Sequence, residues 1–282
     1  MPNDHFSTGK KIAFTGVMFL YINLVLTIFW ILKPLKKSLF IGQYDGDQTF
    51  KLGSMEMLGS SAELLAKGMN LLIAFLLVVF LTLVTRLAKR QRLTYCCMGL
   101  VIAMTFCFWL QINEPSESTV WLFYWFGDLY ISLMLAAFFS FLHDTVDLKN
   151  AKQLYGFIVL GAVSGGAVGS TYFRFWEMNN QQWLQMIIGI GVVICALAFV
   201  AGCLARSIPH HELKPSPNDV PRKKFNAAIE GASLVFKSRY LIAIAGIVGF
   251  YEVTSEVLDY QFTAMIERFV PKEDIGSRFG TV

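Results

Sequence analysis

Charged residues are scarce in this chain, and so are the residues that usually carry enzyme chemistry. Only 16% of the 282 residues are charged, whereas 55% are apolar. There are four histidines, and His211-Glu212 has no second histidine at the spacing that a zinc-protease helix requires. No pair of aspartates on facing apolar segments can be recognised either. We therefore expect a protein that is not an enzyme and that needs no cofactor or metal.

Cysteine chemistry is also not indicated. The five cysteines all fall within long apolar segments: Cys96, Cys97, Cys107, Cys195 and Cys203. Adjacent Cys96 and Cys97 point to different faces of a helix, and no spacing typical of a disulfide framework or a zinc site is present. The net charge of +4 is explained by basic loops beside a membrane, so it predicts no nucleic-acid partner.

Long apolar runs are what the chain has in abundance. A bilayer-spanning helix needs about 20 mostly apolar residues, and the short alternating segments of a membrane β-barrel are missing. We predict seven helical spans, at 12–32, 69–84, 93–112, 120–142, 156–172, 184–204 and 241–265. The expected fold class is an all-α, polytopic membrane protein that resides in the lipid bilayer.

Loop charges predict the orientation. The first apolar run is too long for a signal-peptide core, and lysines follow it where a cleavage site would lie, so it is an uncleaved span. Most Lys and Arg residues lie in alternate loops on the side of the N-terminus, which predicts a cytoplasmic N-terminus. The segment from Lys33 to Lys67 is the exception, because it places five lysines on the outer side.

A long basic segment divides the chain into three parts. Residues 205–240 hold four prolines and the run Arg222-Lys223-Lys224. The apolar residues of 225–235 have helical spacing, so this stretch is either an amphipathic helix at the membrane surface or an ordinary loop. We predict a six-helix half at 1–204, a cytoplasmic linker at 205–240, and the first helix of a second half at 241–282. This is the organisation of a major facilitator-like bundle, in which the site lies between two halves. We expect the sequence to be a fragment of a protein with about twelve spans.

Acidic residues within spans are candidates for function, because charge is costly in lipid. Glu252, Glu256 and Asp259 have offsets of four and seven, so they share one face of the seventh span. We interpret them as a cavity lining that couples or gates transport; alternatively, the helix is shorter and Asp259 lies at the outer interface. Asp128, deep in the fourth span, is expected to contact either a substrate or a Lys or hydroxyl of a neighbouring helix.

Lysines follow the first span directly. Lys33 and Lys36 share a face if the helix continues through Pro34. They then form a cationic lining for an anionic substrate; the alternative is that they anchor the helix end at the membrane surface. In the fifth span, Gly161, Gly165 and Gly169 recur every fourth residue, which predicts close helix packing and not a phosphate loop.

Several segments together resemble the bacterial and plastid nucleotide transporters, the ATP/ADP exchange family related to the major facilitators. Ile31 to Phe40 resembles their basic first-helix motif, although Pro34 and Lys37 depart from it. The other similar segments are Asp128-Leu129-Tyr130 in the fourth span, His143-Asp144 through Gly156, and Leu258-Asp259-Tyr260-Gln261-Phe262 in the seventh. The resemblance implies a nucleotide carrier in which Lys33 and Lys36 contact phosphates, with Asp128 as their partner on the fourth helix.

The leading hypothesis is therefore a transporter of an organic anion, with a nucleotide as the expected solute, acting as a monomer in the bacterial inner membrane. Lys33, Lys36, Asp128 and Lys67 would bind the substrate, and Glu252, Glu256, Asp259 and Arg174 would couple or gate its movement. The alternative is a major facilitator-type, proton-coupled carrier of another small solute. A seven-helix receptor is disfavoured by the predicted cytoplasmic N-terminus.

Overall fold

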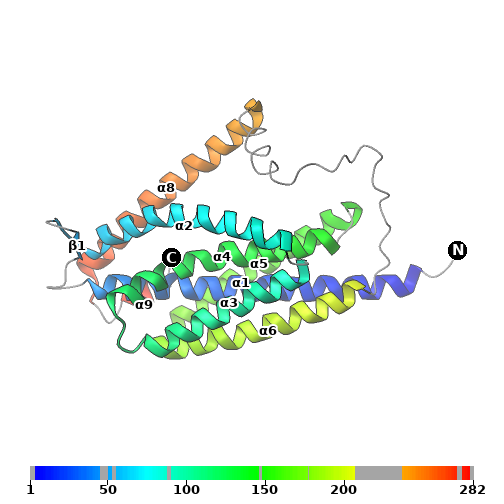
Figure 1. The fold of residues 1–282 in the computed structure, drawn as a ribbon, viewed down its shortest axis with the longest axis horizontal. Coiled ribbons are helices and arrows are strands. Elements are labelled where there is room, and N and C mark those ends of the chain that lie inside the picture. The colour runs from blue at the N-terminus through cyan, green and yellow to red at the C-terminus, as the bar shows by residue number, and fades with distance from the viewer. Residues whose placement is uncertain are drawn as a thin grey trace. The chain divides into compact units, whose positions relative to one another are not determined.

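The computed structural model describes residues 4–44, 50–52, 55–87, 90–145, 148–176, 178–206, 237–271 and 275–279. The chain forms two units, one of Met1–Ile208 with Ile266–Val282 and one of Pro209–Met265. The elements, coloured in chain order in Figure 1, are α1 (Asp4–Gln43), β1 (Phe50–Leu52), β2 (Met55–Met57), α2 (Gly59–Leu87), α3 (Arg90–Gln111), α4 (Glu117–Thr145), α5 (Leu148–Phe175), α6 (Asn180–Arg206), α8 (Arg239–Phe269) and α9 (Ile275–Phe279).

Six helices among the described residues are long and apolar enough to cross a bilayer. They are Ile12–Gln43, Thr94–Gln111, Glu117–Leu142, Tyr155–Phe175, Asn180–Ala205 and Arg239–Phe269. The predicted span at 69–84 lies within α2, and many of its side chains are outside the described set. The helices fit an integral, multi-pass membrane protein, as predicted.

A short hairpin is the departure from the all-α expectation. β1 pairs antiparallel with β2, with Phe50 opposite Met57 and Leu52 opposite Met55. Both strands lie between α1 and α2 in the chain, and Phe50 packs its ring 5.6 Å from that of Tyr44, just beyond α1. The hairpin therefore joins two helices without adding a sheet layer to the bundle.

α1 is the central helix of the first unit, and it packs against α5, α4, α6 and α2. In Figure 1 it runs alongside α4 and α5 for much of its length. Tyr21 of α1 is fully buried and meets Phe138 of α4 edge to face, with ring centroids 5.1 Å apart. The Tyr130 hydroxyl donates to the Val25 carbonyl at 3.1 Å, which adds a hydrogen bond between α4 and α1 in this core.

Glycines explain why α1 and α5 approach so closely. A Cβ on Gly165 would lie 2.1 Å from the Asn23 carbonyl oxygen, and one on Gly169 would lie 2.6 Å from that of Thr27. The contact also carries hydrogen bonds, since the Thr27 hydroxyl donates to the Gly165 carbonyl at 3.2 Å. The prediction that this small-residue stripe packs helices is confirmed, with α1 as the partner.

The end of α1 lies well beyond the predicted limit at residue 32. The helix contains Pro34 and continues to Gln43. Proline removes one backbone donor, but Phe40 and Ile41 beyond it are fully buried, so packing holds the helix together. This continuation places the lysines that follow the first span inside the helical bundle.

The segment that was expected to link the two halves is mostly outside the described residues. Residues 207–236 are not described, so the surface helix considered for 225–235 falls there. The next described long helix, α8, begins at Arg239. The boundaries at 204 and 240 stay predictions.

Candidate functional site

A buried ion pair joins α1 to α4. The Lys36 ammonium donates to Oδ1 of Asp128, and its side chain is only 4% exposed. Asn70 of α2 donates from Nδ2 to Oδ2 of the same carboxylate at 3.0 Å. A Cβ on Gly127 would lie 2.7 Å from Cδ of Lys36, so the lysine stem uses the space that this glycine leaves. Asp128 thus pairs with a lysine of a neighbouring helix, which was one of the two contacts expected for it.

A second buried carboxylate lies beside this pair. Glu63 of α2 is 2% exposed and accepts a hydrogen bond from the Tyr124 hydroxyl at 2.9 Å. Its Oε1 is 3.5 Å from the Lys37 ammonium and 3.7 Å from that of Lys67. The carboxylate therefore bridges lysines from two helices and a phenol from a third.

These charges come together because each helix presents them at helical spacing. Glu63 and Lys67 are four residues apart on α2, and Tyr124 and Asp128 are four apart on α4, so each pair shares a face. α1 supplies the adjacent Lys36 and Lys37, which pair with Asp128 and Glu63 respectively. We call this set the lysine cluster: Lys36, Lys37 and Lys67 with the carboxylates of Glu63 and Asp128.

The lysine cluster is held together by ion pairs in a largely buried setting. Burial in a low-dielectric interior strengthens the interactions among its charged groups. Aromatic rings complete the surroundings, with the Lys36 ammonium 4.3 Å from the centre of the Tyr124 ring and that of Lys37 5.5 Å from Phe279 of α9. The ammonium groups of Lys36 and Lys37 thus have both carboxylates and aromatic rings as neighbours.

Polar contacts fix the helix ends near the cluster. The Ser60 amide in the first turn of α2 donates to Oε2 of Glu267 at 3.0 Å, which places a negative charge at the positive end of that helix. Beyond α1, the Tyr44 hydroxyl donates to Glu117 at 2.8 Å. Burial raises the pKa of the Tyr44 phenol, so it remains a donor at neutral pH. These contacts join the start of α2 to the last turn of α8, and the end of α1 to the start of α4.

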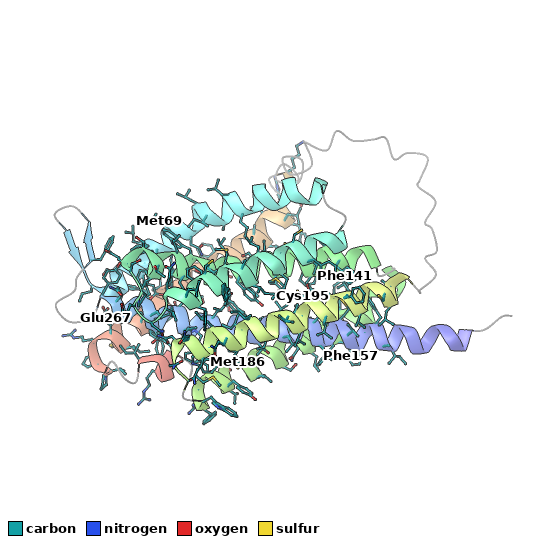
Figure 2. All side chains as sticks on the ribbon, turned by 60° about the horizontal axis from the view of Figure 1, so that its bottom comes forward. Met69, Phe141, Phe157, Met186, Cys195 and Glu267 are labelled. Atoms are coloured by element: carbon teal, nitrogen blue, oxygen red, sulfur yellow. The ribbon has the colours of Figure 1, made fainter. Side chains whose placement is uncertain are left out.

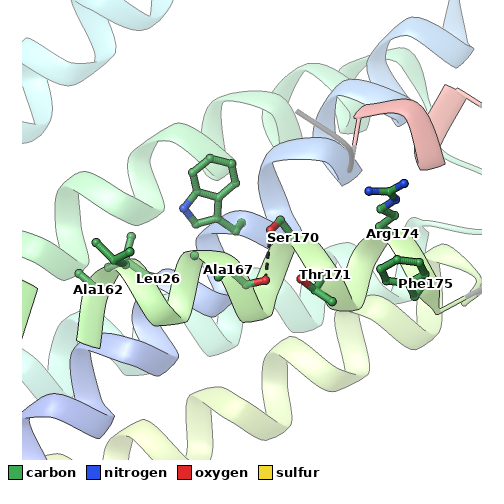
Figure 3. A pocket seen from close by; sticks show the side chains of 10 residues that line it. Leu26, Ala162, Ala167, Ser170, Thr171, Arg174 and Phe175 are labelled. Carbon is green, nitrogen blue, oxygen red and sulfur yellow. Dashed lines mark hydrogen bonds between the residues drawn. The ribbon is translucent and has the colours of Figure 1, made fainter. Parts of the chain in front are cut away.

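A groove between α1 and α5 forms a separate feature, drawn in Figure 3. Its volume is about 540 Å³. Trp30 lines it from α1, and Arg174 lies near its end in the last turn of α5. The half-buried Lys33 places its ammonium 5.0 Å from the centre of the Trp30 ring. Lys33 therefore contacts a wall of the groove, while Lys36 belongs to the cluster.

The three acidic residues of the seventh span lie on α8. Glu252, Glu256 and Asp259 share one face, and the helix runs ten residues past Asp259, to Phe269. The alternative of a shorter helix is wrong. These residues belong to the second unit, whereas the lysine cluster belongs to the first.

Glu63 and Lys37 are the members of the lysine cluster that the sequence reasoning did not assign to the site. The predicted span began at residue 69, so Glu63 was placed in an outer loop, whereas α2 begins at Gly59. Glu63 precedes Lys67 by four residues, and this spacing could have indicated an ion pair on one face of a helix. The alternative that Lys36 anchors a helix end at the membrane surface is wrong, because its side chain is buried among three helices.

The helices and the buried charges define a polytopic membrane protein with a charged site inside its bundle. Comparison with protein-family models, curated proteins and solved structures gave no match for the chain. Among the described residues, no group of three or more His, Cys, Asp or Glu side chains could hold a metal ion.

Proposed function

We propose that this protein transports an organic anion across a membrane, with a nucleotide as the best candidate solute. The observation that carries the proposal is the lysine cluster, in which the buried Lys36 and Lys37 and the partly buried Lys67 pair with the carboxylates of Asp128 and Glu63. Buried charges are retained at a cost, and inside membrane proteins they mark the pathways of polar solutes. Lysine is a common partner of phosphate groups, which a nucleotide carries.

In this proposal, the carboxylates act as resident counter-ions that the solute replaces. Without solute, Lys36 pairs with Asp128 and holds α1 against α4 across Gly127. When a phosphate binds Lys36, Asp128 keeps its hydrogen bond from Asn70, so neither charge is left without a partner. The exchange of partners loosens one helix contact at the moment of binding, which is what alternating access requires.

The likeness to the nucleotide transporters supports the same proposal from the sequence. It assigns phosphate contact to Lys33 and Lys36, and of these two Lys36 belongs to the lysine cluster. The proposal includes a major facilitator-like arrangement, a cytoplasmic N-terminus, residence in the bacterial inner membrane and action as a monomer. Arg174 and the acidic face of α8 remain the proposed gating and coupling residues.

Uptake measurements test the proposal. The protein is expressed in bacteria, and uptake of labelled ATP is measured with and without unlabelled ADP inside. Acceleration by internal ADP is expected, and Lys36→Ala combined with Lys67→Ala should reduce uptake at least about tenfold, since each lost charge costs on the order of 1 kcal/mol or more. Lys237→Ala, an exposed lysine outside the cluster, is the matched control. Unchanged uptake in the double variant would refute the assignment.

A proton-coupled carrier of another solute is the second candidate. The observation in its favour is the acidic face formed by Glu252, Glu256 and Asp259 on α8. It predicts solute uptake that follows an imposed pH gradient, that is insensitive to competing ATP or ADP, and that is lost in Glu256→Gln. ATP uptake without a pH gradient would exclude it.

A further inference from the structure

The groove between α1 and α5 has a floor of small residues and walls of larger ones. Ala162, Gly166 and Ala167 line it from α5, and Leu26 and Trp30 line it from α1. Gly166 is essential to its depth, because a Cβ there would lie 2.8 Å from Nε1 of the Trp30 indole. Its volume of about 540 Å³ lies within the usual range for ligand sites, ~300–1,000 Å³.

The groove lies on an apolar face of the bundle. On α5, the side chains of Phe157, Leu160 and Val163 are all more than half exposed, and Figure 2 labels Phe157. α5 is itself a candidate membrane span. An exposed apolar face on a membrane-spanning helix is suited to contact with acyl chains.

Aromatic residues and a cation lie at one end of the groove. Tyr172 and Trp176 stack at the end of α5, with ring centroids 4.9 Å apart, and such aromatic pairs gather at the level of the lipid headgroups. Arg174 lies between them in the chain and lines the groove, as Figure 3 shows. None of the described lining residues is acidic, and Lys33 adds a second positive charge beside Trp30.

We propose that this groove binds an anionic phospholipid. An acyl chain lies along Leu26, Ala162 and Ala167, and the headgroup phosphate binds the Arg174 guanidinium, whose planar donors match phosphate oxygens. Thr171 and Ser170 line the same end and supply hydroxyls to the headgroup. The Ser170 hydroxyl donates its one hydrogen to the Ala167 carbonyl at 3.2 Å, so its oxygen can accept a hydrogen bond from a hydroxyl of the headgroup. The inference does not depend on the proposed transport function.

Quenching of tryptophan fluorescence tests this proposal. The intact protein, in nanodiscs of phosphatidylcholine, is titrated with phosphatidylglycerol that carries bromine on an acyl chain. Brominated phosphatidylcholine serves as the comparison lipid. We expect a component of quenching that saturates at low phosphatidylglycerol content and that disappears in Trp30→Phe, since bromine quenches only indoles that it touches.

Two pairs of variants separate the headgroup contact from the chain contact. Arg174→Ala should raise the phosphatidylglycerol content needed for half-saturation at least about fivefold, since a basic residue near the surface contributes ~1 kcal/mol to binding an anionic lipid. Arg268→Ala is the matched control, because each arginine lies over the ring of the next residue, at 5.1 Å for Phe175 and 5.6 Å for Phe269. Ala167→Leu should fill the groove and remove the component, whereas Val168→Leu, exposed but outside the groove, should not.

The possible results either support or overturn the lipid site. Selective quenching that is lost in Arg174→Ala and Ala167→Leu and kept in both controls supports a lipid site. Equal quenching by the two headgroups, or no change in Arg174→Ala, overturns it. Displacement of brominated phosphatidylglycerol by free ATP also overturns it, because the groove would then belong to the transported solute.

Discussion

Breaking the pair between Lys36 and Asp128 should destabilise the protein by an amount that depends on which partner is removed. Asp128→Asn leaves the Lys36 ammonium, whose side chain is 4% exposed, without its direct counter-ion. Removing one member of a buried pair costs about 3–5 kcal/mol. Lys36→Met leaves Asp128, which is 27% exposed and keeps its hydrogen bond from Asn70, so its cost should be at or below the lower limit, about 3 kcal/mol.

The double variant gives the decisive comparison. With both charges removed, no buried charge is left unpaired, so Lys36→Met with Asp128→Asn should cost less than Asp128→Asn alone. The assay is thermal unfolding in detergent, where ~1 kcal/mol corresponds to roughly 2–4 °C in Tm for a chain of this size. Lys237→Met controls for the loss of an exposed lysine. Additive losses in the double variant would show that the two side chains do not interact, and would refute the reasoning.

Three further perturbations test other parts of the structure. Gly165→Ala should lower Tm by several degrees, because its Cβ would lie 2.1 Å from the Asn23 carbonyl oxygen; Gly189→Ala, with nothing within 4 Å, should change stability by about 1 kcal/mol or less. Tyr124→Phe should cost about 1–3 kcal/mol by removing the hydrogen bond to buried Glu63, and an unchanged Tm would contradict the network. Glu63→Gln should raise the protein's affinity for ATP in equilibrium binding, because Lys37 and Lys67 lose their shared counter-ion; weaker binding would argue that Glu63 positions the lysines instead.

Hydropathy was sufficient to predict most of the helices, because the cost of exposed backbone in lipid leaves few alternatives. Close packing by α5 could also be predicted, since Gly161, Gly165 and Gly169 have a spacing that serves helix contact, although its partner α1 could not. The end of α1 could not. Pro34 and three lysines have the composition of a helix terminus, and only partners on other helices reveal that the chain continues.

Three members of the lysine cluster were predictable from the sequence, but the cluster as a set was not. Lys36, Lys67 and Asp128 were singled out from their types and positions, yet the carboxylate that joins two of the lysines was not. A long-range ion pair depends on which helix faces meet, and sequence spacing within one helix does not contain that information. For the same reason, Lys33 was grouped with Lys36, although the structure places it against Trp30 and the groove.

The length of α1 has a mechanical consequence. Its 40 residues make a rod about 60 Å long, twice the ~30 Å of the hydrocarbon layer. Both ends therefore reach past the hydrocarbon at any ordinary tilt. If the rod pivots as one body, rocking it by about 10° around its midpoint would swing its ends by roughly 5 Å in opposite directions. In the proposed transport cycle, a small change in the contacts that hold α1 would thereby open one membrane surface and close the other.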